Sequence, residues 1–488
     1  MHRSSRRLLL LALAAAACSD GAARNPLAPT ALETASLAAG TGGTARKLVV
    51  TTAEDEGAGS LRAAIAEANA DTMVRAIKLG EGLGRISPAS PIVYTGRQPL
   101  YFDGGNQVID GSASAGNGLT LTAARSIIVR NIAIEDAADV GLALLVPADA
   151  EGVVQISLEG VRAQGNGGHG ILINDLAAYL QDPDAVGSEG SAAAVRVDLR
   201  NVASVENGFS ALDRDGIRIN EGGLGSLIVT MKGLTIAGNG GDGVELDERG
   251  EGSAEFVLQS SRLTGNGGFA AEDYDDGIDV DEADAGDIIG RFIDVTVSDN
   301  FEQGVDLNEN HAGDMRVELH DVVANGNREE GIEFEEDDDF AGGGDIVATL
   351  RDIVANGNGA LDGDAGLKVR EKGDGNVVVT LGGITANDNA VGGIQVREDA
   401  GGNLMATLRG ITAERNAGNG IQFDENGNGT LTGRLIGASA TGNGRAGVQA
   451  EQATSGTGTL LIAGLTASGN VAGSVVANPA QVTVTITP

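Results

Sequence analysis

Tryptophan is absent from this chain, and phenylalanine and tyrosine bring the aromatic content to only 3%. Glycine occurs 76 times among the 488 residues and is dispersed between pairs of apolar residues. Few aromatic residues and many glycines favour short strands joined by tight turns, in which β-branched and leucine side chains stack on one another. The shortage of Trp and Tyr also argues against subsites that hold sugar rings by aromatic stacking.

A single cysteine, Cys18, excludes a disulfide bond within the chain. It follows three arginines and an apolar run over residues 8–17, which is too short to cross a bilayer as a helix. The sequence Ala-Ala-Ala-Cys that ends this run resembles the lipobox of bacterial lipoproteins, which implies cleavage before Cys18 and lipidation of that residue. An ordinary signal peptide cleaved nearby is the alternative.

Residues 1–18 are therefore predicted to be a leader, and residues 19–46, which contain Ala, Gly, Thr and Pro, a flexible tether. We expect the mature protein to be exported to the bacterial cell envelope, as an outer membrane lipoprotein or in the periplasm, or to the cell surface. The lipid anchor would then be its only contact with a membrane.

Acidic residues outnumber basic residues by 69 to 33, so the formal net charge is −36. Such a surface repels nucleic acid phosphates and anionic lipid headgroups, and no nucleic acid partner is expected. The same surface attracts cations, and the choice between cation binding and simple solubility stays open. The four histidines are not spaced like metal ligands, and His169 and His311 are expected at surface turns.

A helix is predicted over residues 61–70, because Ser60 is a good N-cap and the residues that follow favour helix. Three apolar residues fall on one face of it: Leu61, Ile65 and Ala68. The segment 59–69 resembles the CSLREA-type region that precedes many bacterial surface β-helices, although the cysteine of that name is absent here. The resemblance covers roughly residues 48–135; it implies an exported right-handed parallel β-helix of the pectate-lyase-like type and says little about function. The helix would cover the open end of a stacked core.

From residue 165 onward, a glycine followed by an apolar–x–apolar triplet recurs along the chain. Its occurrences begin at Gly216, Gly243, Gly277, Gly304, Gly331, Gly366, Gly393, Gly420 and Gly447. The step is 27 residues from Gly277 to Gly304 to Gly331, and again in each step from Gly366 to Gly447. A fixed period of this length is typical of a solenoid, a propeller or another repeat array.

Three short pieces with strand-like alternation fill one period, at residues 332–334, 346–350 and 353–355. No run has the helical period that leucine-rich or ankyrin repeats require, and a four-stranded propeller blade usually needs about 40 residues. The pattern therefore predicts an all-β fold, a right-handed parallel β-helix of three-strand coils. We expect a capping region over residues 47–110 and the parallel β-helix repeats over residues 111–488.

A column of asparagines supports this interpretation. Its members each precede the next glycine turn: Asn239, Asn266, Asn300, Asn327, Asn358, Asn389, Asn416, Asn443 and Asn470. Asparagine tolerates left-handed backbone, and its amide can bond to the amide one coil away. We predict a buried ladder, with turn asparagines on a solvated loop as the alternative.

Polar positions of the first strand of each coil form three further columns, all expected on the outer face. The first runs through Arg218, Glu245, Asp279, Asp306, Glu333 and Lys368. The second runs through Asn220, Asp247, Asp281, Asn308, Glu335 and Arg370. The third consists of Glu221, Glu248, Glu282, Glu309, Glu336, Glu371, Glu398 and Glu425. Stacked carboxylates repel one another, since parallel strands lie about 4.8 Å apart.

Three explanations of the acidic columns compete. The carboxylates fan into water, or they hold calcium, which takes six to eight oxygen ligands, or they line a lyase-like groove. The candidate calcium ligands are Glu245, Asp247, Asp276, Asp279, Asp281, Asp306, Glu333 and Glu335. In the lyase interpretation, calcium on Asp279, Asp281 and Asp306 neutralises a uronate carboxylate, and Lys368 or Arg370 acts as the base.

No distinctive catalytic constellation stands out from the repeat. The leading hypothesis is therefore a non-enzymatic β-helix lipoprotein of the cell surface or periplasm, which presents its acidic face to a polysaccharide or another surface protein. The alternative is a calcium-dependent polysaccharide lyase that acts on acidic glycans. Fold alone does not decide between them.

Overall fold

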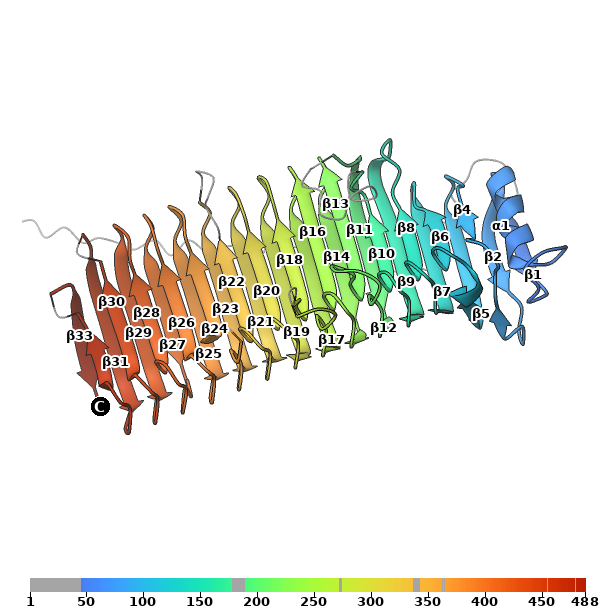
Figure 1. Ribbon diagram of the computed structural model, residues 1–488. Helices are drawn as coiled ribbons and strands as arrows, with labels where there is room; N and C mark the ends of the chain where they lie inside the picture. The colour runs from blue at the N-terminus through green and yellow to red at the C-terminus, as the bar shows by residue number, and fades with distance from the viewer. Residues whose placement is uncertain are drawn as a thin grey trace, which may run out of the picture.

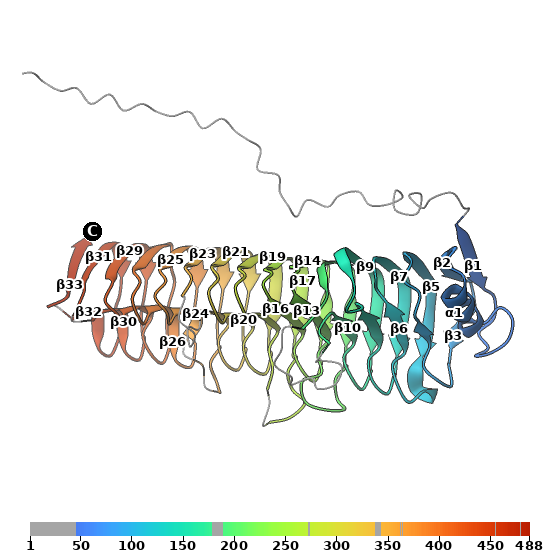
Figure 2. The same cartoon turned by 90° about the horizontal axis from the view of Figure 1, so that it is seen from above.

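The computed structural model describes residues 45–177, 189–271, 274–336, 343–361, 363, 365–453, 455–478 and 480–488. The chain forms a right-handed parallel β-solenoid of about 16 turns with only 3% helix, as Figures 1 and 2 show. The predicted fold class is thereby confirmed. Cys18, the leader and nearly all of the predicted tether lie outside the described residues. Within those residues, no helix has both the length and the apolar character needed to cross a membrane.

One side of every coil belongs to a sheet of fourteen parallel strands, called sheet B here. Its strands are β4 (Val93–Tyr94), β6 (Leu119–Thr122), β8 (Leu142–Leu145), β10 (Ile171–Asn174), β13 (Ile217–Gly223), β16 (Val244–Gly250), β18 (Ile278–Glu282), β20 (Val305–Glu309), β22 (Ile332–Glu336), β24 (Ala365–Glu371), β26 (Gly392–Glu398), β28 (Ile421–Glu425), β30 (Ala446–Gln452) and β32 (Gly473–Ala477). The repeated glycine–apolar–x–apolar triplets therefore all lie in this sheet.

The other two sides belong to a bent sheet of nineteen strands, called sheet A. Its strands are β1 (Arg46–Val50), β2 (Val74–Leu79), β3 (Arg85–Ile86), β5 (Leu100–Asp110), β7 (Ser126–Glu135), β9 (Glu151–Gln164), β11 (Ala192–Arg200), β12 (Ala203–Val205), β14 (Leu227–Lys232), β15 (Thr235–Ala237), β17 (Ala254–Thr264), β19 (Ile288–Ser298), β21 (Met315–Val323), β23 (Ile346–Val354), β25 (Val377–Thr385), β27 (Leu404–Arg409), β29 (Thr430–Ser439), β31 (Thr457–Thr466) and β33 (Val482–Thr487). A short 3-10 helix, η1, spans Gly111–Ala113.

Sheet A bends at one residue per coil that adopts the left-handed backbone conformation. Strand β17 pairs with β14 before Ser260 and with β15 after it, and Ser260 has a φ of 48°. The same corner in later coils is occupied by Asp294, Asp321, Asp352 and Gly383, all with positive φ. Glycine and aspartate tolerate this conformation, so the corner gives each coil the three sides that the repeat predicts.

The register places equivalent residues of successive coils directly on one another. Ile278 pairs with Val305, and Val305 pairs with Ile332, in sheet B. All three side chains are fully buried in a hydrophobic core that runs the length of the solenoid. The predicted stacking of these residues is confirmed.

The asparagine column forms a continuous buried ladder, as predicted. The side-chain amide and the backbone N–H of Asn300 both donate to Oδ1 of Asn327, each at 3.0 Å. Residues Asp299 and Gly326, which precede these asparagines, have positive φ, and this conformation turns each asparagine into the core. The ladder also includes two asparagines that the sequence pattern did not assign to it: Asn166 and Asn207.

Helix α1 (Leu61–Ala70) packs against β1, β2 and β4 and lies at the N-terminal end of the solenoid (Figure 1). The Ser60 hydroxyl accepts a hydrogen bond from the N–H of Ala63 at 3.2 Å, as expected of an N-cap. The buried face of the helix contains Leu61, Ala64, Ile65 and Ala68. The predicted helix and its apolar face are confirmed.

The asparagine ladder gives a first prediction. Asn327→Ala removes a fully buried acceptor and leaves two donors of Asn300 without a partner, which should cost about 2–5 kcal/mol of unfolding free energy. Chemical denaturation measures this cost. Asn428→Ala, at an exposed turn position, is the control and should cost little. Equal stability of the two variants would show that the ladder bonds contribute nothing.

Candidate functional site

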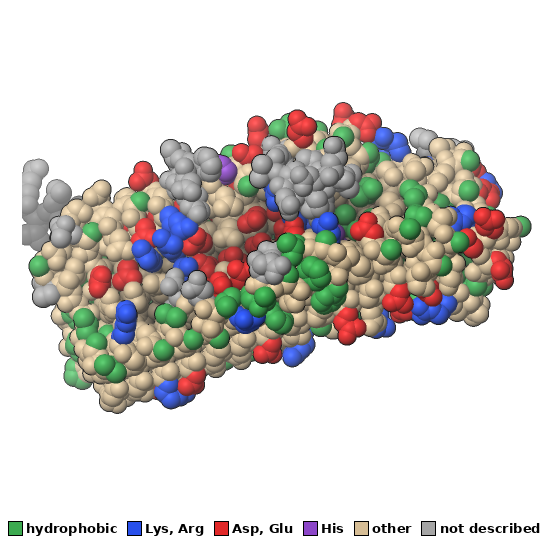
Figure 3. Space-filling model, in the orientation of Figure 1, with side chains coloured by type: hydrophobic (Ala, Val, Ile, Leu, Met, Phe, Trp, Pro, Cys, Tyr) green, Lys and Arg blue, Asp and Glu red, His purple; other side chains and the backbone are tan. Residues whose placement is uncertain are grey.

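The first two acidic columns lie on the outer face of sheet B, over β16, β18, β20 and β22. The register pairs Glu245 with Asp279, Asp279 with Asp306, and Asp306 with Glu333. Figure 3 shows acidic and basic side chains gathered over the middle of this face. Glu245 and Glu333 are only 6% and 5% exposed, and Asp247 is fully buried. These carboxylates do not fan into water, so solvation alone does not explain the stack.

One end of the stack is neutralised by Arg218, which is itself 2% exposed. Its guanidinium lies 2.8 Å from Oδ1 of Asp213 and 2.6 Å from Oδ2 of Asp247, and it also pairs with Asp215 and Glu245. Two predicted calcium ligands, Glu245 and Asp247, therefore already have a cationic partner. The sequence identified Arg218 as a member of the column but did not predict these pairs.

His169 lies behind this end and corrects an expectation. It is 2% exposed, and its Nδ1 accepts a hydrogen bond from the backbone N–H of Asp215 at 2.9 Å. The surface position expected for His169 was wrong, because the next coil covers its turn. Burial raises the pKa of Asp215, but the interactions of its carboxyl group with His169 and Arg218 outweigh burial and hold that pKa below its ordinary value.

The other end of the stack is neutralised by Lys368. Its Nζ lies 2.6 Å from Oε1 of Glu333 and 3.7 Å from Oε2 of Glu335, and Glu335 also pairs with Arg370 and Lys372. Burial alone would lower the pKa of Lys368, but the charge and hydrogen bond of Glu333 raise it above its ordinary value. The predicted ligands Glu333 and Glu335 thus belong to ion pairs, and Lys368 is held protonated.

The centre of the stack has carboxylates without a basic partner. Oxygens of Asp276, Asp279 and Asp306 all lie within 4.8 Å of one another, and a second such group joins Asp242, Glu245 and Asp279. Among the described residues, no Lys, Arg or His forms an ion pair with Asp276, Asp279 or Asp306. Oδ1 of Asp279 and Oδ1 of Asp306 are buried and have no hydrogen-bond partner in the described part of the chain.

Asp242 is a member of the site that sequence reasoning missed. Its Oδ1 accepts the backbone N–H of Asp276 at 2.5 Å, and Oδ1 of Asp215 accepts the N–H of Asp242 at 2.9 Å. A ladder of aspartates thus runs beside the stack. A sequence signal for it exists, because an aspartate directly precedes the repeat glycine at 216, 243 and 277.

Electrostatics at the centre disfavour ionisation. Burial, followed by the charge of neighbouring carboxylates, raises the pKa of Asp276, Asp279 and Asp306 well above the ordinary aspartate value. Burial and Asp247 raise the pKa of Asp281 to about 6. A bound cation or bound protons would relieve this repulsion.

Aromatic residues line one edge of the acidic face despite their low number in the chain. The rings of Phe209 and Phe269 lie 6.3 Å apart, and those of Tyr274 and Phe301 lie 5.6 Å apart. The guanidinium of Arg328 lies 4.2 Å from the centre of the Tyr274 ring. Composition alone argued against a ring-binding surface, but the fold pairs these four aromatic residues in the turns that precede β13, β18 and β20.

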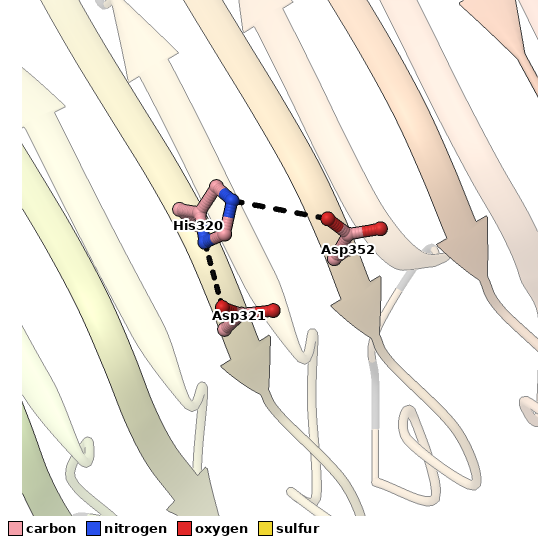
Figure 4. A group of neighbouring side chains, drawn as sticks. All are labelled: His320, Asp321 and Asp352. Carbon is pink, nitrogen blue, oxygen red and sulfur yellow. Dashed lines mark ion pairs between the residues drawn. The ribbon is translucent and has the colours of Figure 1, made fainter.

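A separate group on sheet A contains His320, Asp321 and Asp352 (Figure 4). His320 Nδ1 lies 2.8 Å from Asp321, and Nε2 lies 3.8 Å from Asp352, so the imidazole bridges the two carboxylates. All three side chains are at least half exposed. Both aspartates are corner residues with positive φ, a conformation that aspartate tolerates. The backbone therefore explains why aspartate occurs at these two positions, and no bound ligand is needed to explain it.

Solved structures with a similar fold are pectate-lyase-like β-helices. Pectate lyase Pel9A has a TM-score of 0.39 and 15% identity, over 72% of this chain and 78% of its own. The A-module of the mannuronan C-5 epimerase AlgE6 from Azotobacter vinelandii has a TM-score of 0.37 and 13% identity, over 90% and 99%. The periplasmic alginate epimerase AlgG has a TM-score of 0.36 and 12% identity, over 84% and 80%. No protein-family model and no curated protein matches the chain.

The contribution of Arg218 to stability is testable by substitution. Arg218→Met leaves the buried Glu245 without its cation and leaves Asp247 with Arg249 alone, which should cost about 3–5 kcal/mol near pH 8. The cost should be smaller near pH 5, because Glu245, whose pKa is raised by burial, takes up a proton there. Urea denaturation at both pH values measures it. Arg291→Met, which removes an exposed pair with Glu318, is the control; an equal cost would refute a special role for Arg218.

Proposed function

We propose that this protein is a non-enzymatic binding β-helix of the bacterial cell envelope, whose outer face on sheet B holds Ca²⁺ and through it an acidic polysaccharide. The observation that carries the proposal is the trio Asp276, Asp279 and Asp306. These carboxylates converge within 4.8 Å and have no basic partner among the described residues, and two of them present buried oxygens without a hydrogen bond. Hard carboxylate oxygens are the ligands that Ca²⁺ prefers.

The two ends of the stack confine the proposed ion to the centre. Arg218 and Lys368 neutralise the predicted ligands Glu245, Asp247, Glu333 and Glu335, and their charges repel a second cation. If each of the three carboxylates offers one oxygen, at least three of the six to eight positions that Ca²⁺ takes remain for water and ligand oxygens. A glycan carboxylate or hydroxyl supplies such oxygens, and the aromatic edge offers its rings an apolar surface.

The two bases that the sequence suggested for the lyase alternative are both engaged in ion pairs. A general base must be able to accept a proton near the working pH, whereas Lys368 is held protonated by Glu333. Arg370 is paired with Asp399 at 2.8 Å and with Glu335. A calcium-dependent polysaccharide lyase would therefore need a base other than the two that the sequence suggested.

Calcium binding is tested by thermal melts near pH 5 and pH 8, with Ca²⁺ and with chelator. Because folding raises the pKa of Asp276, Asp279 and Asp306, the native state binds more protons, and raising the pH lowers the stability of the metal-free protein. Ca²⁺ at about 100 times its Kd should restore about 2.7 kcal/mol. The double variant Asp279→Asn, Asp306→Asn should be more stable than wild type without Ca²⁺ near pH 8 and should show no Ca²⁺ shift.

The matched control for these melts is Glu318→Gln, which removes an exposed carboxylate on sheet A and should keep the full Ca²⁺ shift. A shift of equal size in wild type and double variant, or no shift in either, would mean that the central carboxylates do not bind the ion. The glycan part of the proposal is tested separately. Binding to a panel of acidic and neutral glycans should require Ca²⁺, without release of unsaturated, ultraviolet-absorbing products; their release would establish the lyase alternative.

Export and anchoring are proposed from the leader sequence alone. Cys18 lies outside the described residues. Lipidation at Cys18 predicts that globomycin leaves a larger precursor and that the mature protein partitions into detergent. Cys18→Ser should move the protein to the aqueous phase. Unchanged partition of that variant would rule out the anchor and favour an ordinary signal peptide.

A further inference from the structure

The third acidic column lies inside the solenoid, which corrects the expectation that it faces outward. Eight glutamates, one from each of eight consecutive coils, are fully buried: Glu221, Glu248, Glu282, Glu309, Glu336, Glu371, Glu398 and Glu425. Each pairs in register with the next within sheet B, as Glu282 does with Glu309 and Glu309 with Glu336. We call this set the glutamate column. The column lies one residue beyond the outer stack and points the opposite way.

One oxygen of each glutamate in the middle of the column is held by the turn that follows. Oε1 of Glu282 accepts the N–H of Gly286 at 2.9 Å, Oε1 of Glu309 accepts the N–H of His311 at 3.1 Å, and Oε1 of Glu371 accepts the N–H of Gly375 at 3.1 Å. In four of these glutamates the other oxygen, Oε2, is buried and accepts no hydrogen bond from the described residues: Glu282, Glu309, Glu371 and Glu398. These oxygens face the neighbouring glutamates.

Six of the eight glutamates have no basic partner in the described part of the chain. Among the described residues, no Lys, Arg or His forms an ion pair with Glu221, Glu248, Glu282, Glu309, Glu371 or Glu398. After each turn, the first or second residue of the sheet A strand is apolar and buried. These residues are Leu227, Ala254, Ile288, Met315, Ile346, Val377, Leu404 and Leu431. The charged group at the N-terminal end is another acid, Asp175, which raises the pKa of Glu221 further.

The C-terminal end of the column shows which chemistry its positions require. The next coil has Gln452 in place of glutamate, and its Nε2 donates to Oε2 of Glu425 at 3.0 Å. Its Oε1 accepts the N–H of Leu431 at 2.8 Å. An amide thus acts as acceptor with one atom and as donor to the preceding coil with the other. A protonated carboxyl group has the same pair of functions, whereas a carboxylate accepts only.

We propose that the glutamate column is a proton-binding site, in which neutral carboxylic acids donate their O–H groups to carboxyl groups of adjacent coils. Each retained proton supplies the donor that the buried oxygens lack. The column then resembles the asparagine ladder, with acids in place of amides.

The energetics agree with this arrangement. Burial, together with the adjacent glutamates, raises the pKa of Glu309 to about 9 and of Glu371 to about 10. The unfolded pKa of glutamate is about 4.3. Between these values the native state binds more protons than the unfolded state, so the column favours folding in acid and loses that contribution as the pH rises toward 9–10.

The double variant Glu309→Gln, Glu371→Gln tests the proposal in the full-length protein, because neither residue adjoins a candidate calcium ligand. Glutamine keeps the shape and carries its own donor, so the melting temperature should stay close to wild type near pH 4 and exceed it by several degrees near pH 8. Unfolding near pH 6.5 should release about two fewer protons than in wild type, as calorimetry in buffers of different ionisation enthalpy measures. Glu318→Gln, an exposed change in the following strand β21, should alter neither quantity.

Infrared spectroscopy provides a direct readout. The native protein near pH 7 should show the carbonyl band of protonated carboxylic acids, and the double glutamine variant should lose part of it. The contribution of the outer acidic stack to this band is measured with the double variant Asp279→Asn, Asp306→Asn. This variant leaves the glutamate column intact and should keep the part of the carbonyl band that the glutamine variant loses. A native protein without this band, or a double glutamine variant that is less stable at both pH values and releases as many protons as wild type, would overturn the proposal.

Discussion

Parallel stacking in register is the constraint on which the rest of this structure depends. Every coil places its residues about 4.8 Å from the equivalent residues of the previous coil, so a side chain must be compatible with a copy of itself. Apolar residues such as Ile278, Val305 and Ile332 satisfy this condition by packing. Asparagine satisfies it because its amide both donates and accepts, and a ladder of asparagines therefore fills a corner that no apolar residue could satisfy.

Carboxylates fail the same condition, because they only accept hydrogen bonds and repel their copies. Two charges at about 4.8 Å repel by about 3.5 kcal/mol at an effective dielectric constant of about 20, and burial increases the cost. The chain meets this problem in several ways. Arg218 and Lys368 supply counter-charge at the ends of the outer stack. Backbone N–H groups satisfy the aspartate ladder of Asp215, Asp242 and Asp276.

The repeat made most of the fold predictable, and its failures have physical reasons. Fixed steps of 27 residues predicted the coil, the asparagine column and the pairing of Ile278 with Val305. The glutamate column was placed on the wrong face because glutamate is polar. The strand period alone would have placed it correctly, since Glu282 shares the parity of Ile278 and Val280, which point inward.

Side-chain reach was the part of the site that sequence could not supply. The pairing of Arg218 with Asp213 spans an irregular turn that the repeat does not describe, whereas Lys368 and Glu333 are neighbours in the first column and the register alone brings them together. The eight candidate ligands nevertheless included four that are already paired. Asp242 was missed because it precedes the repeat triplet and does not belong to it.

The centre of the outer stack and the glutamate column differ in their surroundings, and this difference separates the proposed function from stability. The outer stack lies on the outer face of sheet B, where the proposed ion and its ligand would meet the protein. The glutamate column is fully buried and is held by the turns that follow sheet B, and its proposed ligand is the proton. Under the proposed function, a change of charge on the outer face alters what the solenoid binds. A change of charge inside alters the pH range over which the solenoid stays folded, and with it the conditions under which the outer face exists at all.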